Sequence, residues 1–290
     1  MFEDTLSLKK YTANVTSRRF SRRSFIKRAA GVTASALIAD RFAPSSEAFR
    51  EYLPYDAARD AHYGFRYGWL EHHHPSLDST GEKFVFVRLK YPGGDWYTNI
   101  IDYYRWPSDL KFTEILAQET SIDVERHEHP QYVSLDDPEL FAYPFLFMTG
   151  HIGVSFSDDD VRKLREYLER GGFLHVEDCD IRLDSGGRMR PAIHRLMKQV
   201  FPDKKFERLD MSHPLYHTLY NHNEYMGGDK LIPPYDFDEG ILFDDRIAVY
   251  FCPSDLNCAW EGRVCEPAGE EQRRWAFEQG MNVVAYALSR

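Results

Sequence analysis

The sequence predicts a doubly wound α/β fold with a mostly parallel sheet, and two observations predict it. Apolar runs without polar alternation recur along the chain, as in FLFM at 145–148, and such runs are typical of strands buried on both faces. Between them lie polar stretches with apolar residues at helical spacing, as in SDDDVRKLREYLER at 157–170. The expected architecture is flavodoxin-like, with strand order 2-1-3-4-5.

Residues 144–180 are the clearest part of this pattern and read as strand, helix, strand. Ser157 is a plausible N-cap before an acidic first turn, and Gly171 stands where a left-handed C-cap is expected. A crossover of this length is almost always right-handed, so both strands end at the same edge of the sheet. Residues 149–151 are therefore expected beside residues 177–180, at the edge where such folds bind ligands.

The other elements follow in chain order. Apolar runs predict strands at 84–89, at 206–209 and at 247–251, and Val124 and residues 133–135 bracket a further short strand. Helical spacing predicts helices at 109–120, with Ser108 as N-cap, at 189–200 and at 270–288. Segment 218–240 is rich in Tyr, Asn, Gly and Pro and is interpreted as an insertion or lid.

The N-terminus resembles a twin-arginine export signal. Residues 21–27 read SRRSFIK, with Arg22 and Arg23 as the arginine pair. The apolar run that follows is shorter than the roughly 20 residues that span a bilayer, and small residues at 46 and 48 suit a signal peptidase. The alternative is a basic tail before a chance apolar run. The export interpretation implies the twin-arginine machinery as a partner, and a periplasmic or other extracytoplasmic protein without a transmembrane segment in the mature chain.

The resulting organisation is a signal peptide at 1–48, an N-terminal arm at 49–82 and one α/β domain at 83–290. The three histidines at 72–74 lack the spacing of a helical metal motif and are interpreted as part of the arm. A formal net charge of −10 argues against a nucleic-acid binder, which needs a basic face for phosphates.

Four loops should meet at the carboxyl edge of the sheet: 92–98, 149–153, 177–182 and 252–262. The segment at His213 follows another strand and is a candidate to join them. The candidate catalytic residues are His151, Glu177, Asp178 and Cys179. The candidate ligand-binding residues, with Trp96 and Trp260 as apolar walls, are Asp95, Trp96, Asp180, His213, Asp255, Trp260 and Glu261.

Close carboxylates repel one another, which raises the pKa of at least one of them unless a cation is present. A raised acid beside an ionised one is a workable general acid–base pair. A divalent cation such as Ca²⁺ or Mg²⁺ would also relieve the repulsion, so the cofactor stays open. The alternative is that Arg182, Arg188 or Arg190 neutralises the acids and the cluster is structural.

The four cysteines form no C-x-x-C pair, which argues against structural zinc and thioredoxin chemistry. In an oxidising compartment two of Cys252, Cys258 and Cys265 could form a disulfide. Buried, reduced thiols are the alternative.

Several stretches together resemble an uncharacterised bacterial family, a domain of unknown function assigned to the class I glutamine-amidotransferase-like fold. They are LDDPELFAYPFLFMTGH, LREYLERGGFLHVEDCD, HPLYH, NCAWEG and GMNVVAYAL, and the resemblance covers about residues 83–288. It implies the flavodoxin-like architecture and no activity. True amidotransferases carry their nucleophile in G-x-C-x-G. Cys179 stands near that place without flanking glycines, and its acidic neighbours are expected to raise its pKa, which argues against glutaminase activity.

Two functions remain from the sequence. The first is a non-catalytic module that binds a small molecule or an envelope protein at an acidic pocket on the carboxyl edge. The alternative is an envelope hydrolase that uses His151 and the carboxylates, with a metal as a further option. The sequence favours the module, because its motifs do not assemble a nucleophile, a base and an oxyanion site.

Overall fold

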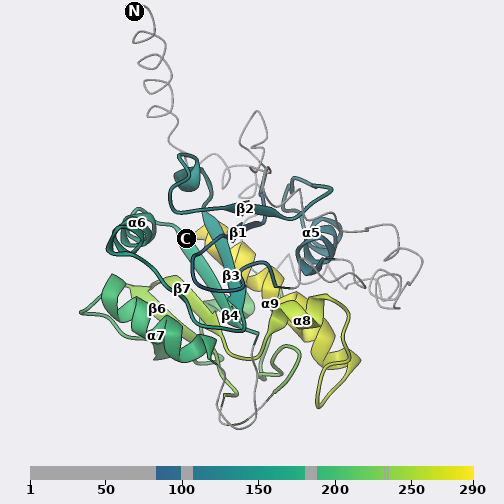
Figure 1. The fold of residues 1–290 in the computed structure, drawn as a ribbon. Coiled ribbons are helices and arrows are strands. Elements are labelled where there is room, and N and C mark those ends of the chain that lie inside the picture. The colour runs from purple at the N-terminus through teal and green to yellow at the C-terminus, as the bar shows by residue number, and fades with distance from the viewer. Residues whose placement is uncertain (1–82, 99–106, 180–187, 232, 234) are drawn as a thin grey trace, which may run out of the picture.

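The computed structural model describes residues 83–98, 107–179, 188–231, 233 and 235–290, and everything below concerns these residues. They form a seven-stranded sheet between two layers of helices (Figure 1). The strands are β1 (Val87–Leu89), β2 (Gln131–Val133), β3 (Phe145–Gly150), β4 (Phe173–Asp178), β5 (Glu207–Arg208), β6 (Glu239–Phe243) and β7 (Arg246–Cys252). The helices are α5 (Ser108–Glu119), α6 (Asp158–Glu169), α7 (Met189–Val200), α8 (Leu256–Trp260) and α9 (Glu270–Ser289), with one-turn 3₁₀ helices at Leu140–Ala142 and Pro214–His217.

The strand order is β2-β1-β3-β4-β7-β6-β5. The first five strands are parallel, whereas β6 and β5 run antiparallel to their neighbours. The mixed α/β class and the mostly parallel sheet are thus as the sequence predicts. The order of the first four strands also agrees, and the fifth parallel position is taken by β7, beyond which β6 and β5 extend the sheet.

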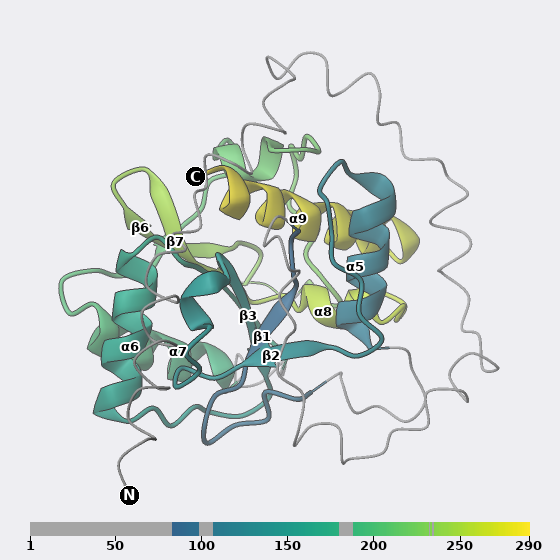
Figure 2. The same cartoon turned by 90° about the horizontal axis from the view of Figure 1, so that it is seen from above.

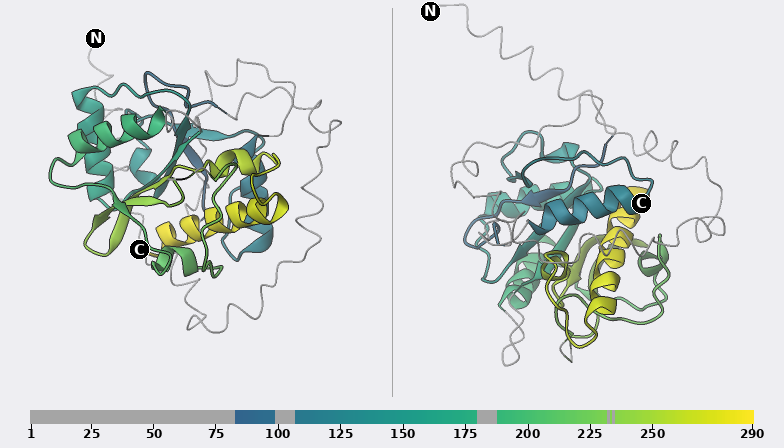
Figure 3. Two further views of the ribbon diagram at one scale, coloured as in Figure 1. Left: turned by 90° about the horizontal axis from the view of Figure 1, so that it is seen from below. Right: turned by 90° about the vertical axis from the view of Figure 1, so that its right-hand side faces the viewer.

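Helices cover both faces of the sheet (Figure 2), and each face has its own core. Helices α6 and α7 cover one face with aliphatic side chains such as Val161, Leu164 and Ile193. Helices α5, α8 and α9 cover the other face with larger aromatic residues such as Phe112 and Trp260. Figure 3 shows α9 beside α5 on this second face. Because successive strand residues point to opposite faces, the apolar runs of β3 and β4 fill both cores at once.

The unit from β3 to β4 agrees closely with the sequence prediction. Ser157 caps α6 reciprocally with Asp160, since each side chain accepts a hydrogen bond from the other residue's backbone N–H. Gly171 has φ +100°, the left-handed conformation expected after the helix. Strands β3 and β4 pair in parallel, with Thr149 opposite Glu177 and Gly150 opposite Asp178. Their carboxyl ends therefore lie together, which is what positions the site described below.

Two local predictions were wrong, and one strand was not predicted. The missing strand is β6, which starts at the end of the region interpreted as an insertion or lid at 218–240 and pairs antiparallel with β7. The loop expected at 252–262 contains α8, which Asp255 caps from a left-handed conformation with φ 60°. Ser108 is the first residue of α5 and not its cap, because Pro107 occupies that position and no side chain caps the helix. Among the helices of the described chain, none has the length and apolarity needed to cross a bilayer.

Candidate functional site at the carboxyl edge of the sheet

A histidine, two cysteines and several carboxylates meet where β3, β4 and β7 end. His151 follows β3, Cys179 follows β4, and Asp255 begins α8 just after β7. The backbone N–H of Cys179 donates to the carbonyl of Gly150 at 3.1 Å, which continues the pairing of β3 and β4 into the site. The site is thus fixed by the sheet itself and by the short helix that follows its central strand.

Asp95 orients His151 from the loop after β1. Its Oδ2 lies 2.7 Å from His151 Nδ1, and its Oδ1 accepts from the backbone N–H of His151 at 2.9 Å. A carboxylate only accepts, so Nδ1 carries the proton. The hydroxyl of Thr98 lies 3.1 Å from the same nitrogen. Nε2, the other ring nitrogen, is therefore the atom that can exchange a proton with a reacting group.

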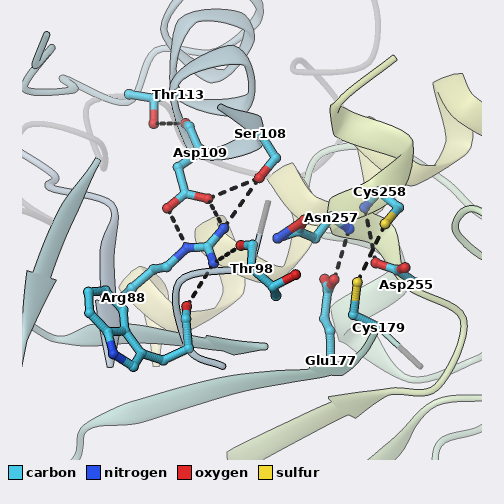
Figure 4. A network of polar contacts seen from close by, with 11 residues as sticks. Arg88, Thr98, Ser108, Asp109, Thr113, Glu177, Cys179, Asp255, Asn257 and Cys258 are labelled. Atoms are coloured by element: carbon cyan, nitrogen blue, oxygen red, sulfur yellow. Dashed lines mark hydrogen bonds and ion pairs between the residues drawn. The ribbon is translucent and has the colours of Figure 1, made fainter. Parts of the chain in front are cut away.

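Cys179 lies between His151 and a second thiol. Its Sγ is 3.5 Å from Sγ of Cys258 on α8. Figure 4 draws the two side chains and this contact. The side chains of His151 and Asp255 also hydrogen-bond Cys179. Cys179 is 7% exposed, whereas the His151 side chain is 40% exposed. Solvent therefore reaches the site past the side chain of His151.

The contacts around Cys179 favour an ion pair between its thiolate and the His151 imidazolium. Hydrogen bonds from Cys258, His151 and Asp255 lower the pKa of Cys179 well below its usual value, although burial opposes this. The hydrogen bonds of His151 to Asp95 and then to Cys179 raise its pKa to about 10. The expectation that acidic neighbours raise the Cys179 pKa was wrong, because these hydrogen bonds outweigh the nearby carboxylates.

Glu177 and Asp178 are separated by the sheet and do not form the expected acid pair. Consecutive strand residues point to opposite faces. Glu177 accepts from the backbone N–H of Asn257 at 2.8 Å at the start of α8, and its Oε1 lies 2.9 Å from Nε2 of His175. Asp178 accepts from the backbone N–H of Arg190 at 2.8 Å, at the start of α7. Each carboxylate therefore lies at the N-terminus of a different helix, where the dipole favours negative charge.

The acid that does share the face of Glu177 is Asp255. Burial raises the pKa of Asp255 well above its usual range, and the charges of Cys179 and Glu177 add to this effect. Burial also raises the pKa of Glu177. Asp255 Oδ1 accepts from the backbone N–H of Cys258 at 3.0 Å, and a carboxylate oxygen of this helix-capping residue lies within 4.8 Å of both thiol sulfurs.

Of the arginines expected to neutralise the acids, Arg190 pairs its side chain with a different carboxylate. The guanidinium of Arg190 pairs with both oxygens of Glu239 at 2.9 Å. Arg263 is the cation that lies near the acidic cluster. The charges of Cys258, Glu261, Asp255 and Asp229 raise its pKa, although burial opposes this. Its Nε donates to Glu261 at 3.0 Å, and its side chain is 39% exposed. Arg182 lies outside the described residues.

The remaining candidates lie apart from this cluster. Trp96 is buried in the core on the α6 and α7 face, against Tyr132, and Trp260 is buried in the opposite core, stacked on Phe112. Neither forms a wall of the site. His213 packs on Tyr286, whose hydroxyl accepts from the N–H of Ile247 at the start of β7, so it lies at the opposite end of the sheet. Asp180, Arg22, Arg23 and the arm at 49–82 lie outside the described residues.

Three residues of the site offer ligand atoms close enough for one metal ion. These are Cys179, Asp255 and Cys258, whose ligand atoms all lie within 4.8 Å of one another. Two thiolates suit a soft ion such as Zn²⁺ better than the hard Ca²⁺ or Mg²⁺ expected from the carboxylates alone.

Sequence reasoning missed three contributors: Cys258, Thr98 and Arg263. Cys258 was considered only as a disulfide partner of the two other late cysteines, which the structure places elsewhere. All four cysteines are free, Cys252 Sγ lies 3.2 Å from the hydroxyl of Ser254, and Cys265 donates to the carbonyl of Arg263. One signal could have identified Cys258. It stands three residues after Asp255 and six residues after the end of β7, so it lies in the first turn of the helix that Asp255 caps.

The sequence was also compared with known proteins. The model of a family described as a domain of unknown function, DUF4159, matches residues 85–288. The comparison with curated proteins found no match.

Proposed function

The chain belongs to the DUF4159 family, whose function is unknown, and from the site alone we propose that it is a cysteine-dependent hydrolase or acyl transferase. The observation that carries the proposal is the position of His151 between Asp95 and Cys179. A nucleophile, a base within hydrogen-bond reach of it and a third group that orients the base are the signature of covalent catalysis. Asp95 is the orienting group, His151 the base and acid, and Cys179 the nucleophile.

The substrate class is a carboxylic ester, thioester or amide. The Cys179 thiolate adds to the carbonyl carbon, and the carbonyl electron pair moves to oxygen. When the carbonyl re-forms, the bond to the leaving group breaks and His151 donates its proton to that group. Water then adds to the thioester, with its proton passing to His151, and the cysteine is released. Asp95 holds the imidazole orientation throughout.

Selective alkylation tests the nucleophile. Iodoacetamide is expected to modify Cys179 faster than the other cysteines at neutral pH, because the thiolate is the reacting form. His151→Gln and Asp95→Asn should both slow the reaction. Cys265→Ser is the matched control, because burial raises the pKa of Cys265 to about 12 and its loss should leave the rate unchanged. Equal rates in the wild type and His151→Gln would contradict the assignment.

The non-catalytic module remains a second candidate, and one observation favours it. The two backbone N–H groups at the start of α8, those of Asn257 and Cys258, already donate to Glu177 and Asp255. They are therefore occupied and do not serve as an oxyanion site. A Cys179→Ser variant that still retains a small molecule or an envelope protein, while no acyl substrate is turned over by the wild type, would favour this module.

Two further properties belong to the proposal. We place the fold in the flavodoxin-like, class I glutamine-amidotransferase-like class, and the strand order β2-β1-β3-β4 supports this. We also propose export by the twin-arginine machinery to the periplasm or another extracytoplasmic space, on the strength of SRRSFIK at 21–27. Replacing Arg22 and Arg23 with lysine should leave the precursor in the cytoplasm, and normal export of that variant would exclude this route.

A further inference from the structure

Cys258 is a buried thiol that the hydrolytic mechanism does not use. It is 2% exposed and lies on α8, 79 residues after Cys179 in the sequence, with the two sulfurs 3.5 Å apart. A disulfide has a sulfur–sulfur distance of about 2.05 Å, so the sulfurs need to approach by about 1.5 Å, a movement within the range of side-chain rotation. Figure 4 shows the two sulfurs facing each other.

The two thiols differ in their exposure. Cys179 lies beside His151, whose side chain is 40% exposed, so a small oxidant can reach it from that side. Cys258 is the more buried of the two, and its sulfur contacts that of Cys179. A cysteine that an oxidant reaches, in contact with a second thiol, is the arrangement of an oxidation-sensitive cysteine and its resolving partner.

We propose that Cys179 and Cys258 form a peroxide-responsive dithiol pair, in which Cys258 converts oxidised Cys179 into a reversible disulfide. The Cys179 thiolate attacks the terminal oxygen of a hydroperoxide and the O–O bond breaks, so that a sulfenic acid forms; the other oxygen takes a proton from the His151 imidazolium and leaves as water or an alcohol. The sulfur of Cys258 then attacks the sulfur of Cys179. An S–S bond forms, the S–O bond breaks, and the hydroxyl leaves as water with the proton of Cys258. The hydroperoxide accepts the two electrons.

The other two cysteines are not alternatives for this role. Cys252 is fully buried in β7, and its sulfur is hydrogen-bonded to Ser254. Cys265 donates to the carbonyl of Arg263. Cys179 and Cys258 are the cysteines whose sulfurs contact each other, at 3.5 Å.

Peptide mass spectrometry after oxidation tests the pair. The full-length reduced protein, freed of metal with a chelator, is treated with hydrogen peroxide, and the remaining thiols are then alkylated. The wild type should yield one cross-linked species that joins the Cys179 and Cys258 peptides and disappears on treatment with dithiothreitol. Cys258→Ser should lose the cross-link and accumulate a Cys179 sulfenic acid that dimedone traps, followed by the sulfinic acid. Cys258→Ala provides the same test if the serine variant fails to fold.

Cys265→Ser is the control and should retain the cross-link. Over-oxidation of Cys179 in the wild type without a cross-link would overturn the proposal. So would stoichiometric zinc in the protein as isolated that is lost in Cys258→Ser and protects both thiols from peroxide, because the pair would then be a metal site. The proposal concerns the nucleophile of the proposed hydrolase, but its readout is mass. A cross-link without any hydrolysis would remove only the proposed function.

Discussion

The buried ion pair between Arg88 on β1 and Asp109 on α5 provides the sharpest prediction about stability. Arg88 Nε and Nη2 donate to the two carboxylate oxygens of Asp109 at 2.7 and 2.6 Å, and both side chains are almost fully buried. Arg88 Nη1 also donates to the carbonyls of Trp96 and Thr98, at 3.0 and 2.5 Å. One guanidinium therefore fixes α5 to the sheet and holds the loop that carries Asp95.

Arg88→Met leaves the Asp109 carboxylate buried without its cation, which costs about 3–5 kcal/mol. The two carbonyls that lose a donor add about 1 kcal/mol each. We therefore expect a loss of about 5 kcal/mol or more, a large part of the stability of a domain of this size. Arg88→Met with Asp109→Leu removes both charges, so it should be more stable than Arg88→Met alone, with a coupling energy of about 3 kcal/mol.

Urea unfolding measures the effect in the wild type, Arg88→Met, Asp109→Leu and the double variant. The slope of the unfolding free energy against urea concentration should be the same in all four. Arg162→Met is the control, because Arg162 forms an exposed pair with Asp159 one turn along α6 and its loss should not be measurable. If Arg88→Met does not fold, Arg88→Lys keeps the charge but loses the planar fork and should show a smaller loss. A loss below about 1 kcal/mol for Arg88→Met, or strict additivity in the double variant, would refute the reasoning.

Two more predictions concern the second core and the site. Burial raises the pKa of Asp238, which accepts from the hydroxyls of Tyr216, Tyr225 and Tyr250, to about 6. Its contribution to stability is therefore fully present below about pH 4 and is lost as pH rises through about 6, so thermal unfolding should show a decline across this range that Asp238→Asn removes. An unchanged pH slope in Asp238→Asn would exclude Asp238 as its source. A Cβ at Gly150 would lie 2.2 Å from the Tyr91 hydroxyl and 2.9 Å from Asp95 Oδ1, so Gly150→Ala should cost about 1–3 kcal/mol and slow the alkylation of Cys179. Gly153→Ala, whose Cβ would meet only Ala192 at 3.7 Å, should do neither, and equal behaviour of the two variants would contradict the assigned role of Gly150.

The sequence was most informative where local rules act alone. The unit from β3 to β4 has a capping box, a left-handed glycine and two fully buried strands with apolar starts, and it agrees with the prediction almost residue by residue. β6 was missed because Glu239 and Gly240 interrupt its apolar run and because its strand character depends on pairing with β7. α8 was missed because it has only five residues and starts from a left-handed aspartate.

The site was only partly predictable for a related reason. Topology placed His151 and Cys179 at one edge, since right-handed crossovers align the ends of parallel strands. It could not place Cys258 against Cys179, because that contact depends on how α8 packs across the end of β4. The alternation of strand side chains, in contrast, could have separated Glu177 from Asp178 in advance. The prediction for Trp96 and Trp260 failed for a similar reason. Both stand in sequence near site residues, but their side chains are buried in the two different cores.

The two outermost strands have a consequence for the behaviour of this protein in solution. β2 contains three residues and β5 only two, Glu207 and Arg208, which are exposed and of opposite charge. Long, flat, apolar edges are templates for the strands of other chains, and short or charged edges are not. The described sheet therefore offers little backbone for edge-to-edge aggregation, and concentrated samples should resist β-type assembly as long as the native fold persists.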